Sequence, residues 1–248
     1  MCIFSEPVKL VNNTKIFARR GESNSQFLAY AMDYEAQTDL AMILPLPTPV
    51  RSPEDSIRFI DLSLCPKFFE KLQSCFPTLN EWVASLRFQS RSLAPQTLKI
   101  HEVGSFVASF LPTISDFERL DPQFRLDKTI WHSLPIYADY GFAVFKLKAG
   151  TKTIHPIAFE FPTRDQSLFL PTVHVHNGTV PTYARFDHSF YIQSSIKQPQ
   201  FEMSDDQAGK FIDSKMQGIW ELVRPDVHIQ KRNLNGKELN QDTILYNV

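Results

Sequence analysis

Prolines at positions 45, 47 and 49 restrict what this stretch of the chain can form. Proline has no backbone N–H, and in an extended chain residues spaced by two direct their N–H groups the same way. One side of the segment 45–49 therefore lacks three donors in a row and cannot carry a continuous β-ladder. We expect the preceding strand, residues 39–44, to end on an unpaired edge or to leave its sheet here.

The rest of the chain predicts extended segments joined by stiff turns, since it holds 17 prolines and only 8 glycines. Alternating or β-branched runs predict strands at 14–20, 26–34, 98–111, 140–150, 155–163, 168–178 and 184–193. Helical signals occur at 53–73, 115–120 and 205–222. Together they predict an α+β fold, mostly antiparallel β-sheet with a few helices packed on one side.

The length of 248 residues fits a single domain over residues 1–248. The Ser-rich segment 78–97 carries no clear signal for a helix or strand, so any division into two subdomains is expected there.

Charge and motifs exclude several functional classes. The 26 basic and 27 acidic residues nearly balance, which argues against binding to nucleic acid or to an anionic membrane surface. No apolar run approaches the ~20 residues of a membrane span, and no signal peptide is visible. The three cysteines fit a reducing compartment, so we expect a cytoplasmic location. No glycine-rich nucleotide motif is present, and we expect no cofactor.

Cys2 stands directly behind the initiator methionine. Removal of Met1 would leave a cysteine with both a thiol and a free α-amine. The amine, with a pKa of about 7.7–8.0, can accept the thiol proton and activate a nucleophile. The alternative is that Cys2 simply begins an apolar strand with Ile3 and Phe4.

Residues 2–22 resemble the start of choloylglycine-type N-terminal-nucleophile hydrolases, which open with Met-Cys and carry an arginine motif one hairpin later. Here that motif reads Phe17-Ala18-Arg19-Arg20-Gly21-Glu22. The resemblance implies a cysteine amidohydrolase that cleaves a C–N amide bond. Cys2 would attack, Arg19 would stabilise the thiolate, and Asn177 would assist the oxyanion.

His174 and His176 form a second candidate site. Residues i and i+2 of a strand face the same side, so both rings can approach one metal ion. His188 is the candidate third ligand, with Asp187 as its alternative, because neighbours on one strand face opposite sides. Three histidines suit zinc, whereas two histidines and a carboxylate suit non-haem iron. The alternative is an ordinary polar strand face.

A wider resemblance links the MCIF start, the LPLP strand exit, YGFAVFKLKAG and HPIAFEFPT to an uncharacterised bacterial protein family. That resemblance implies a common origin with this family, but the family has no established activity that could be carried over. Because no motif establishes an enzyme, we expect a soluble protein that binds a small molecule or another protein. The cysteine amidohydrolase and the metal-binding protein are the alternatives.

Overall fold

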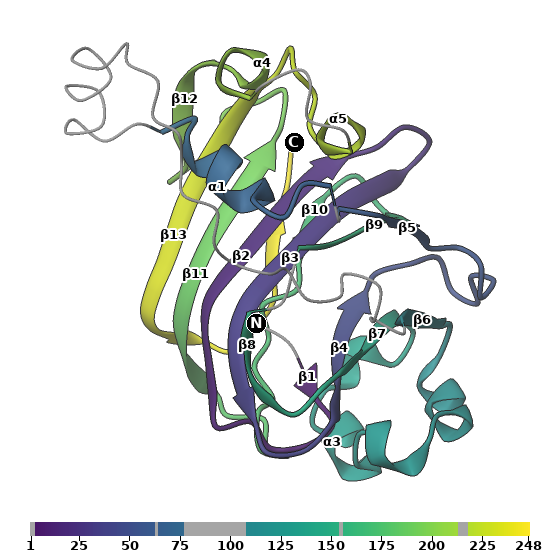
Figure 1. The fold of residues 1–248 in the computed structure, drawn as a ribbon. Helices are drawn as coiled ribbons and strands as arrows, with labels where there is room; N and C mark the ends of the chain where they lie inside the picture. Colours follow the sequence, from purple (N-terminus) through teal and green to yellow (C-terminus); the bar gives the residue numbers. More distant parts are fainter. Residues whose placement is uncertain (1–2, 63, 77–107, 154–155, 213–217) are drawn as a thin grey trace.

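A computed structural model describes residues 3–62, 64–76, 108–153, 156–212 and 218–248 (Figure 1). Two β-sheets pack face to face and form most of this part of the chain. The expected subdomain boundary near 78–97 lies outside the described residues.

The larger sheet, among the described residues, has eight strands, with β8 placed beside β3 and the others in the order β12-β13-β11-β2-β3-β9-β5. Its strands are β2 (Leu10–Arg20), β3 (Ser25–Ala36), β5 (Arg58–Ile60), β8 (Gly150–Thr153), β9 (Ile157–Pro162), β11 (Tyr183–Gln193), β12 (Glu202–Gln207) and β13 (His228–Leu239). The predicted hairpin is present, since β2 and β3 pair antiparallel. By contrast, β11 runs parallel to β2, from the pair His188 and Thr14 to the pair Gln193 and Arg19. The sheet is therefore mixed.

The smaller sheet of the described residues has the order β1-β4-β7-β6. Its strands are β1 (Ile3–Phe4), β4 (Leu40–Leu46), β6 (Ala108–Leu111) and β7 (Gly141–Leu147). Strand β4 pairs with β7 over its whole length, but β1 covers only Met42 and Ile43. Pro45 therefore pairs on one side only, opposite Phe142, and the chain leaves the sheet after Leu46. This agrees with the missing donors of the proline segment. A separate pair joins β10 (Leu168–Leu170) to β14 (Thr243–Leu245).

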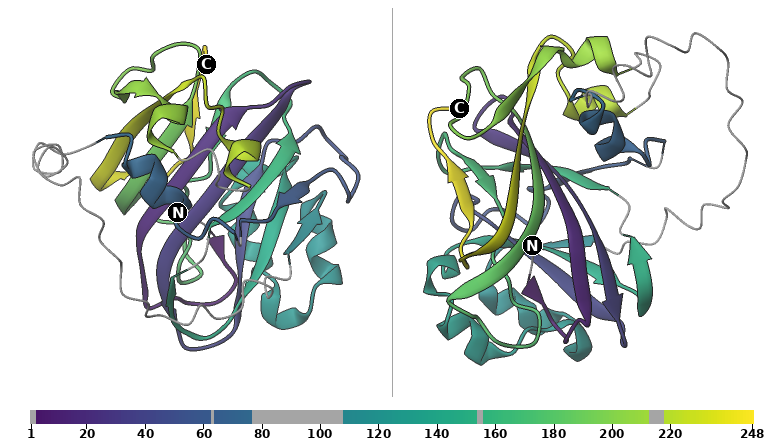
Figure 2. Two further views of the ribbon diagram at one scale, coloured as in Figure 1. Left: turned by 45° about the horizontal axis from the view of Figure 1, so that its top comes forward. Right: turned by 90° about the vertical axis from the view of Figure 1, so that its left-hand side faces the viewer.

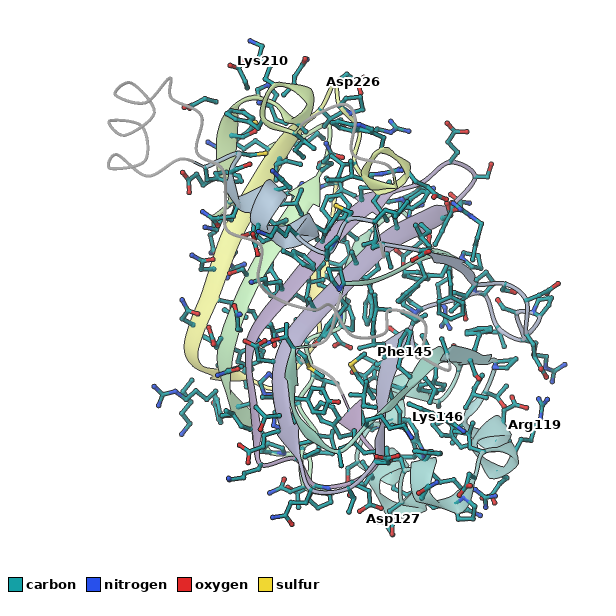
Figure 3. The ribbon with its side chains drawn as sticks, in the orientation of Figure 1. Arg119, Asp127, Phe145, Lys146, Lys210 and Asp226 are labelled. Carbon is teal, nitrogen blue, oxygen red and sulfur yellow. The ribbon has the colours of Figure 1, made fainter. Side chains whose placement is uncertain are left out.

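An apolar core fills the space between the two sheets, and strand alternation decides which side chains enter it. Phe145 of β7 points into this core, where its ring lies 6.1 Å from that of Phe159 of β9 (Figure 3). The next residue, Lys146, faces the other way and lies 4.5 Å from the ring centre of Phe124.

The helices are short and form two groups, as both views in Figure 2 show. They are α1 (Phe68–Gln73), η1 (Ile114–Arg119), η2 (Pro122–Phe124), α3 (Lys128–His132), η3 (Pro135–Tyr137), α4 (Ala208–Phe211) and α5 (Ile219–Leu222). Phe68 and Ile219 pack with Phe17 on the outer face of the larger sheet. Trp131 packs with Ile43 on the outer face of the smaller sheet. The helices therefore lie on two sides of the sheet pair, not on one.

Two of the predicted helices are only partly helical in the described residues. Within 53–73, residues Arg58–Ile60 form β5 on the edge of β9, and only Phe68–Gln73 is helical. Within 205–222, the residues up to Gln207 belong to β12, which pairs with β13, and only Ala208–Phe211 and Ile219–Leu222 are helical among the described residues. In both places pairing with a neighbouring strand outweighs a weak local helix preference. No helix of the described residues is long and apolar enough to span a membrane.

Candidate functional site

The segment carrying His174 and His176 is held by two backbone hydrogen bonds, from Phe4 N to the Val175 carbonyl and from Val8 N to the His176 carbonyl, and by the side chain of Asn240. The backbone N–H of His174 donates to Oδ1 of Asn240 at 2.6 Å, and Nδ2 of Asn240 donates to the His174 carbonyl at 2.9 Å. Asn240 Nδ2 also donates to the Pro181 carbonyl at 2.9 Å. Strand β1 adds a short parallel bridge between Ile3 and Val175. The sequence predicted a strand here, and the structure has an extended segment clamped by Asn240.

The three predicted histidines gather into one group with Phe186, which we call the histidine cluster (His174, His176, His188 and Phe186). The rings of His174 and His176 stack with centroids 5.1 Å apart, so the two side chains share one side as predicted. The ring of His174 lies 5.5 Å from that of His188 and 4.4 Å from that of Phe186. Alternation along β11 turns Phe186 and His188 inward and leaves Asp187 exposed.

Burial controls the charge of the cluster. His174 is 4% exposed and His188 is 1% exposed. Burial lowers the pKa of His174 to about 2 and the pKa of His176 to about 4. The same cause lowers the pKa of His188 far below its ordinary value. All three rings are therefore neutral at pH 7. The Nε2 atoms of His174 and His176 are buried without a hydrogen-bond partner in the described part of the chain.

The predicted metal ligands lie together without the geometry of a metal centre. No group of three or more His, Cys, Asp or Glu side chains among the described residues is arranged to hold a metal ion. Asp187, the alternative ligand, instead accepts a hydrogen bond from the backbone N–H of Asn13 at 2.9 Å. The metal site therefore stays a prediction that these contacts do not support.

A cavity of about 580 Å³ opens beside the histidine cluster, of a size that suits a small molecule. It lies between the start of β2, the 174–177 segment and the start of β11. Asn177 lines it and is exposed, and its Oδ1 accepts a hydrogen bond from Thr179 at 3.2 Å.

Arg19, which the hydrolase resemblance would set beside the thiolate, has its own hydrogen-bond partners on the larger sheet. Its side chain lies on the outer face of the larger sheet, where it stacks 3.8 Å above the ring centre of Phe27. Its Nε atom donates to the carbonyl of Leu222, and its Nη2 atom donates to the carbonyl of Glu221 at 2.8 Å. Strand β1 belongs to the other sheet, and its start lies beside Val175. Arg19 thus caps the end of α5, whereas Cys2 lies outside the described residues.

No sequence pattern pointed to the two side chains that hold this region in place, Asn240 and Asp242. Asp242 is half-buried and accepts hydrogen bonds from Thr172 N at 2.7 Å, Val173 N at 3.0 Å and Tyr137 Oη at 2.5 Å. The run Asn240-Gln241-Asp242 is typical of a turn. Its partners lie 66 to 105 residues earlier, and no local pattern reveals them.

Solved structures give one fold likeness over the whole chain. A crystal structure of baculovirus P35 aligns with a TM-score of 0.51 and 16% sequence identity, over 100% of this chain and 99% of P35. The fold is similar to that of baculovirus P35. A crystal structure of the caspase-8/P35 complex aligns with a TM-score of 0.45 and 15% identity, over 94% of this chain and 95% of P35. A mutated P35 after caspase cleavage aligns with a TM-score of 0.49 and 16% identity, over 95% and 99% of the two chains. No family model matches the sequence.

Proposed function

We propose that this chain binds a partner protein, and that the partner is a protease of the caspase class. The observation that carries the proposal is the likeness to baculovirus P35, which extends over nearly the full length of both chains. P35 has been solved in a complex with caspase-8 and, in a mutated form, after caspase cleavage. A cytoplasmic location belongs to the same proposal.

His174 and His176 are not poised to act as a general acid or base. A general acid or base works best with a pKa near the working pH. The pKa values of His174 and His176, lowered to about 2 and about 4, are far from that range. Arg19, the second residue of the hydrolase alternative, is engaged by the carbonyls of α5. A protein that only binds a partner does not require the histidines or Arg19 to take part in a reaction.

The test measures complex formation with purified caspase-8 in the active form. Baculovirus P35 is the positive control, and a trypsin-like serine protease is the negative control. We expect the chain to co-elute with caspase-8 and to lower its hydrolysis of a fluorogenic peptide in a saturable way. A chain concentration of about 10 µM detects complexes with a Kd of ~1 µM, equivalent to about −8 kcal/mol.

Either result of the binding assay decides the caspase proposal. Co-elution with caspase-8 but not with the serine protease supports the proposal. If P35 binds while this chain neither co-elutes with a panel of caspases nor changes their activity, the caspase proposal is wrong. Intact mass of the chain after incubation then reports whether binding is accompanied by cleavage.

A further inference from the structure

The cavity beside the histidine cluster opens where two parallel strands separate. Strands β2 and β11 pair from Thr14 and His188 onward, and before this point, among the described residues, β2 pairs only with β3 and β11 only with β13. The β2–β3 ladder shifts its register here, and Asn13 has a φ of 51°, in the left-handed region that asparagine tolerates. A bulge of this kind bends its strand. The space of about 580 Å³ is therefore built by the backbone.

The wall of this cavity contains side chains whose hydrogen-bonding groups are not used. Asn12, His174 and His176 all line it. Oδ1 of Asn12 and the Nε2 atoms of both histidines are buried and have no hydrogen-bond partner among the described residues. His174 is only 4% exposed. Because buried polar atoms in native proteins nearly always have a partner, three such atoms around one cavity favour a bound molecule that supplies the partners.

The cavity offers no buried counter-charge to a charged ligand. Lys9 pairs with Glu35 at 2.7 Å, and Asp187 already accepts a hydrogen bond from a backbone N–H at 2.9 Å. Arg185 is exposed and lies on the face of β11 opposite to Phe186. Burial keeps both histidine rings neutral at pH 7. A charged molecule would therefore lose its water against this wall without compensation, which favours an uncharged ligand.

We propose that this cavity, which we call the histidine pocket, binds a small uncharged molecule with several hydroxyl groups, of the sugar or polyol class. A hydroxyl group both donates and accepts, so it suits Oδ1 of Asn12, which only accepts, and an imidazole nitrogen in either tautomer. The ring of Phe186, 4.4 Å from that of His174, supplies an apolar surface for the C–H groups of such a ligand. The volume lies within the range of small-molecule sites. The histidine pocket does not depend on the proposed protease contact.

The test uses the full chain with D-glucose, maltose and myo-inositol as neutral probes, and with glucosamine and glucuronate as the cationic and anionic counterparts of glucose. Saturation-transfer difference NMR measures binding, and long-range ¹H–¹⁵N spectra follow the ring nitrogens of the histidines. We expect a neutral probe to bind saturably at concentrations up to about 10 mM, and His176→Phe to weaken this binding by about tenfold, because a hydrogen bond is lost. The ring-nitrogen signals of His176 should shift with the same saturation curve.

The matched control is His132→Phe, which makes the same replacement at an exposed position of α3 outside the cavity. Circular dichroism checks that both variants fold. Asn12→Leu is the second variant, because it removes the unpartnered Oδ1 from another part of the wall and leaves the histidines in place. It should also weaken binding.

Each result decides for or against the histidine pocket. Binding of a neutral probe that is weakened in His176→Phe or Asn12→Leu and unchanged in His132→Phe supports it. Absence of saturable binding by every neutral probe overturns it, and so does binding that these two pocket variants leave unchanged or that His132→Phe weakens equally. Tighter binding of glucosamine or glucuronate than of glucose would show that the ligand class is wrong. None of these results depends on whether caspase-8 binds.

Discussion

Asn240 holds the backbone of His174 from both sides, with Oδ1 2.6 Å from the His174 nitrogen and Nδ2 2.9 Å from the His174 oxygen. A β-strand partner would supply the same two contacts through its backbone. One side chain thus replaces a stretch of ladder, which explains why residues 172–176 are extended without belonging to a long strand.

Replacing Asn240 with alanine should destabilise the protein by about 2–4 kcal/mol. The change leaves backbone groups of His174 and Pro181 without their partner in a partly buried region, at roughly 1–3 kcal/mol for each unsatisfied group. Urea unfolding measures the effect. Asn235→Ala is the control, because Asn235 is an exposed residue of β13. If Asn240→Ala and Asn235→Ala lower the free energy of unfolding equally, the hydrogen bonds of Asn240 do not stabilise the segment that carries His174.

Tyr137 should matter through its hydroxyl group. Its Oη donates to the buried carboxyl of Asp242 at 2.5 Å, so Tyr137→Phe removes one of the three donors that this carboxyl has. We expect a loss of about 1–3 kcal/mol, as for other hydrogen bonds to charged groups. Thermal unfolding checks this, with the half-buried Tyr140→Phe as the control. If the Tyr137→Phe protein is as stable as wild type, the backbone N–H groups of Thr172 and Val173 are enough to stabilise the Asp242 carboxyl.

Stability should fall in mild acid because of the histidine cluster. The unfolded histidines have a pKa of about 6.5, whereas burial lowers the folded pKa of His174 to about 2 and of His176 to about 4. Below pH 6.5 the unfolded chain binds more protons than the folded one, so stability decreases as the pH falls. The loss for His176 continues to about pH 4, and the loss for His174 continues further. Each contributes about 1.4 kcal/mol per pH unit.

The variant that checks this prediction is His174→Phe, which keeps a flat ring without a titrating nitrogen. Urea midpoints measured from pH 7.5 to 4.5 should depend less steeply on pH than in wild type. His132→Phe, on an exposed position of α3, should keep the wild-type slope. Identical slopes for all three proteins would mean that the cluster does not carry the acid sensitivity.

Purified protein should hold far less than one transition-metal ion per chain. The histidine rings are close, yet no set of three potential ligands among the described residues has a suitable arrangement. Elemental analysis measures the metal content, with the double variant His174→Ala/His176→Ala as control. Close to one zinc or iron per chain, lost in the double variant, would restore the metal-binding alternative.

Arg19 should be important for stability and unimportant for any reaction of Cys2. Arg19→Met removes the donors that satisfy the Leu222 and Glu221 carbonyls, and we expect a loss of about 2–4 kcal/mol. Alkylation of Cys2 at pH 7, followed by mass spectrometry under native conditions, should proceed at an unchanged rate. The intact mass of the wild type comes first, because a retained Met1 removes the free amine and excludes the amidohydrolase. A large fall in the alkylation rate of Cys2 in the Arg19→Met protein would support a role of Arg19 in stabilising the Cys2 thiolate.

The sequence was informative wherever local chemistry decides the structure. The β2–β3 hairpin, the exit from the sheet after Leu46 and the shared side of His174 and His176 all follow from alternation or from missing donors. It failed where distant segments decide. Arg58–Ile60 lies within the predicted helical segment 53–73, but pairing with β9 prevailed. Neither Asn240 nor Asp242 carries a local mark of its partner. His188 was predicted as a third ligand from a neighbouring strand, and only the tertiary fold sets its distance from His174.

The parallel pairing of β2 with β11 also constrains how the chain folds during synthesis. Thr14 pairs with His188 and Arg19 pairs with Gln193. The β2–β3 hairpin can form early, but the other edge of β2 has no strand partner until most of the protein has been made. At a translation rate of about 5–20 residues per second, the wait is roughly 10–35 s. Throughout that time one edge of β2 and its apolar faces are open to other chains. Newly made protein should therefore depend on chaperones, and chains truncated before residue 183 should aggregate.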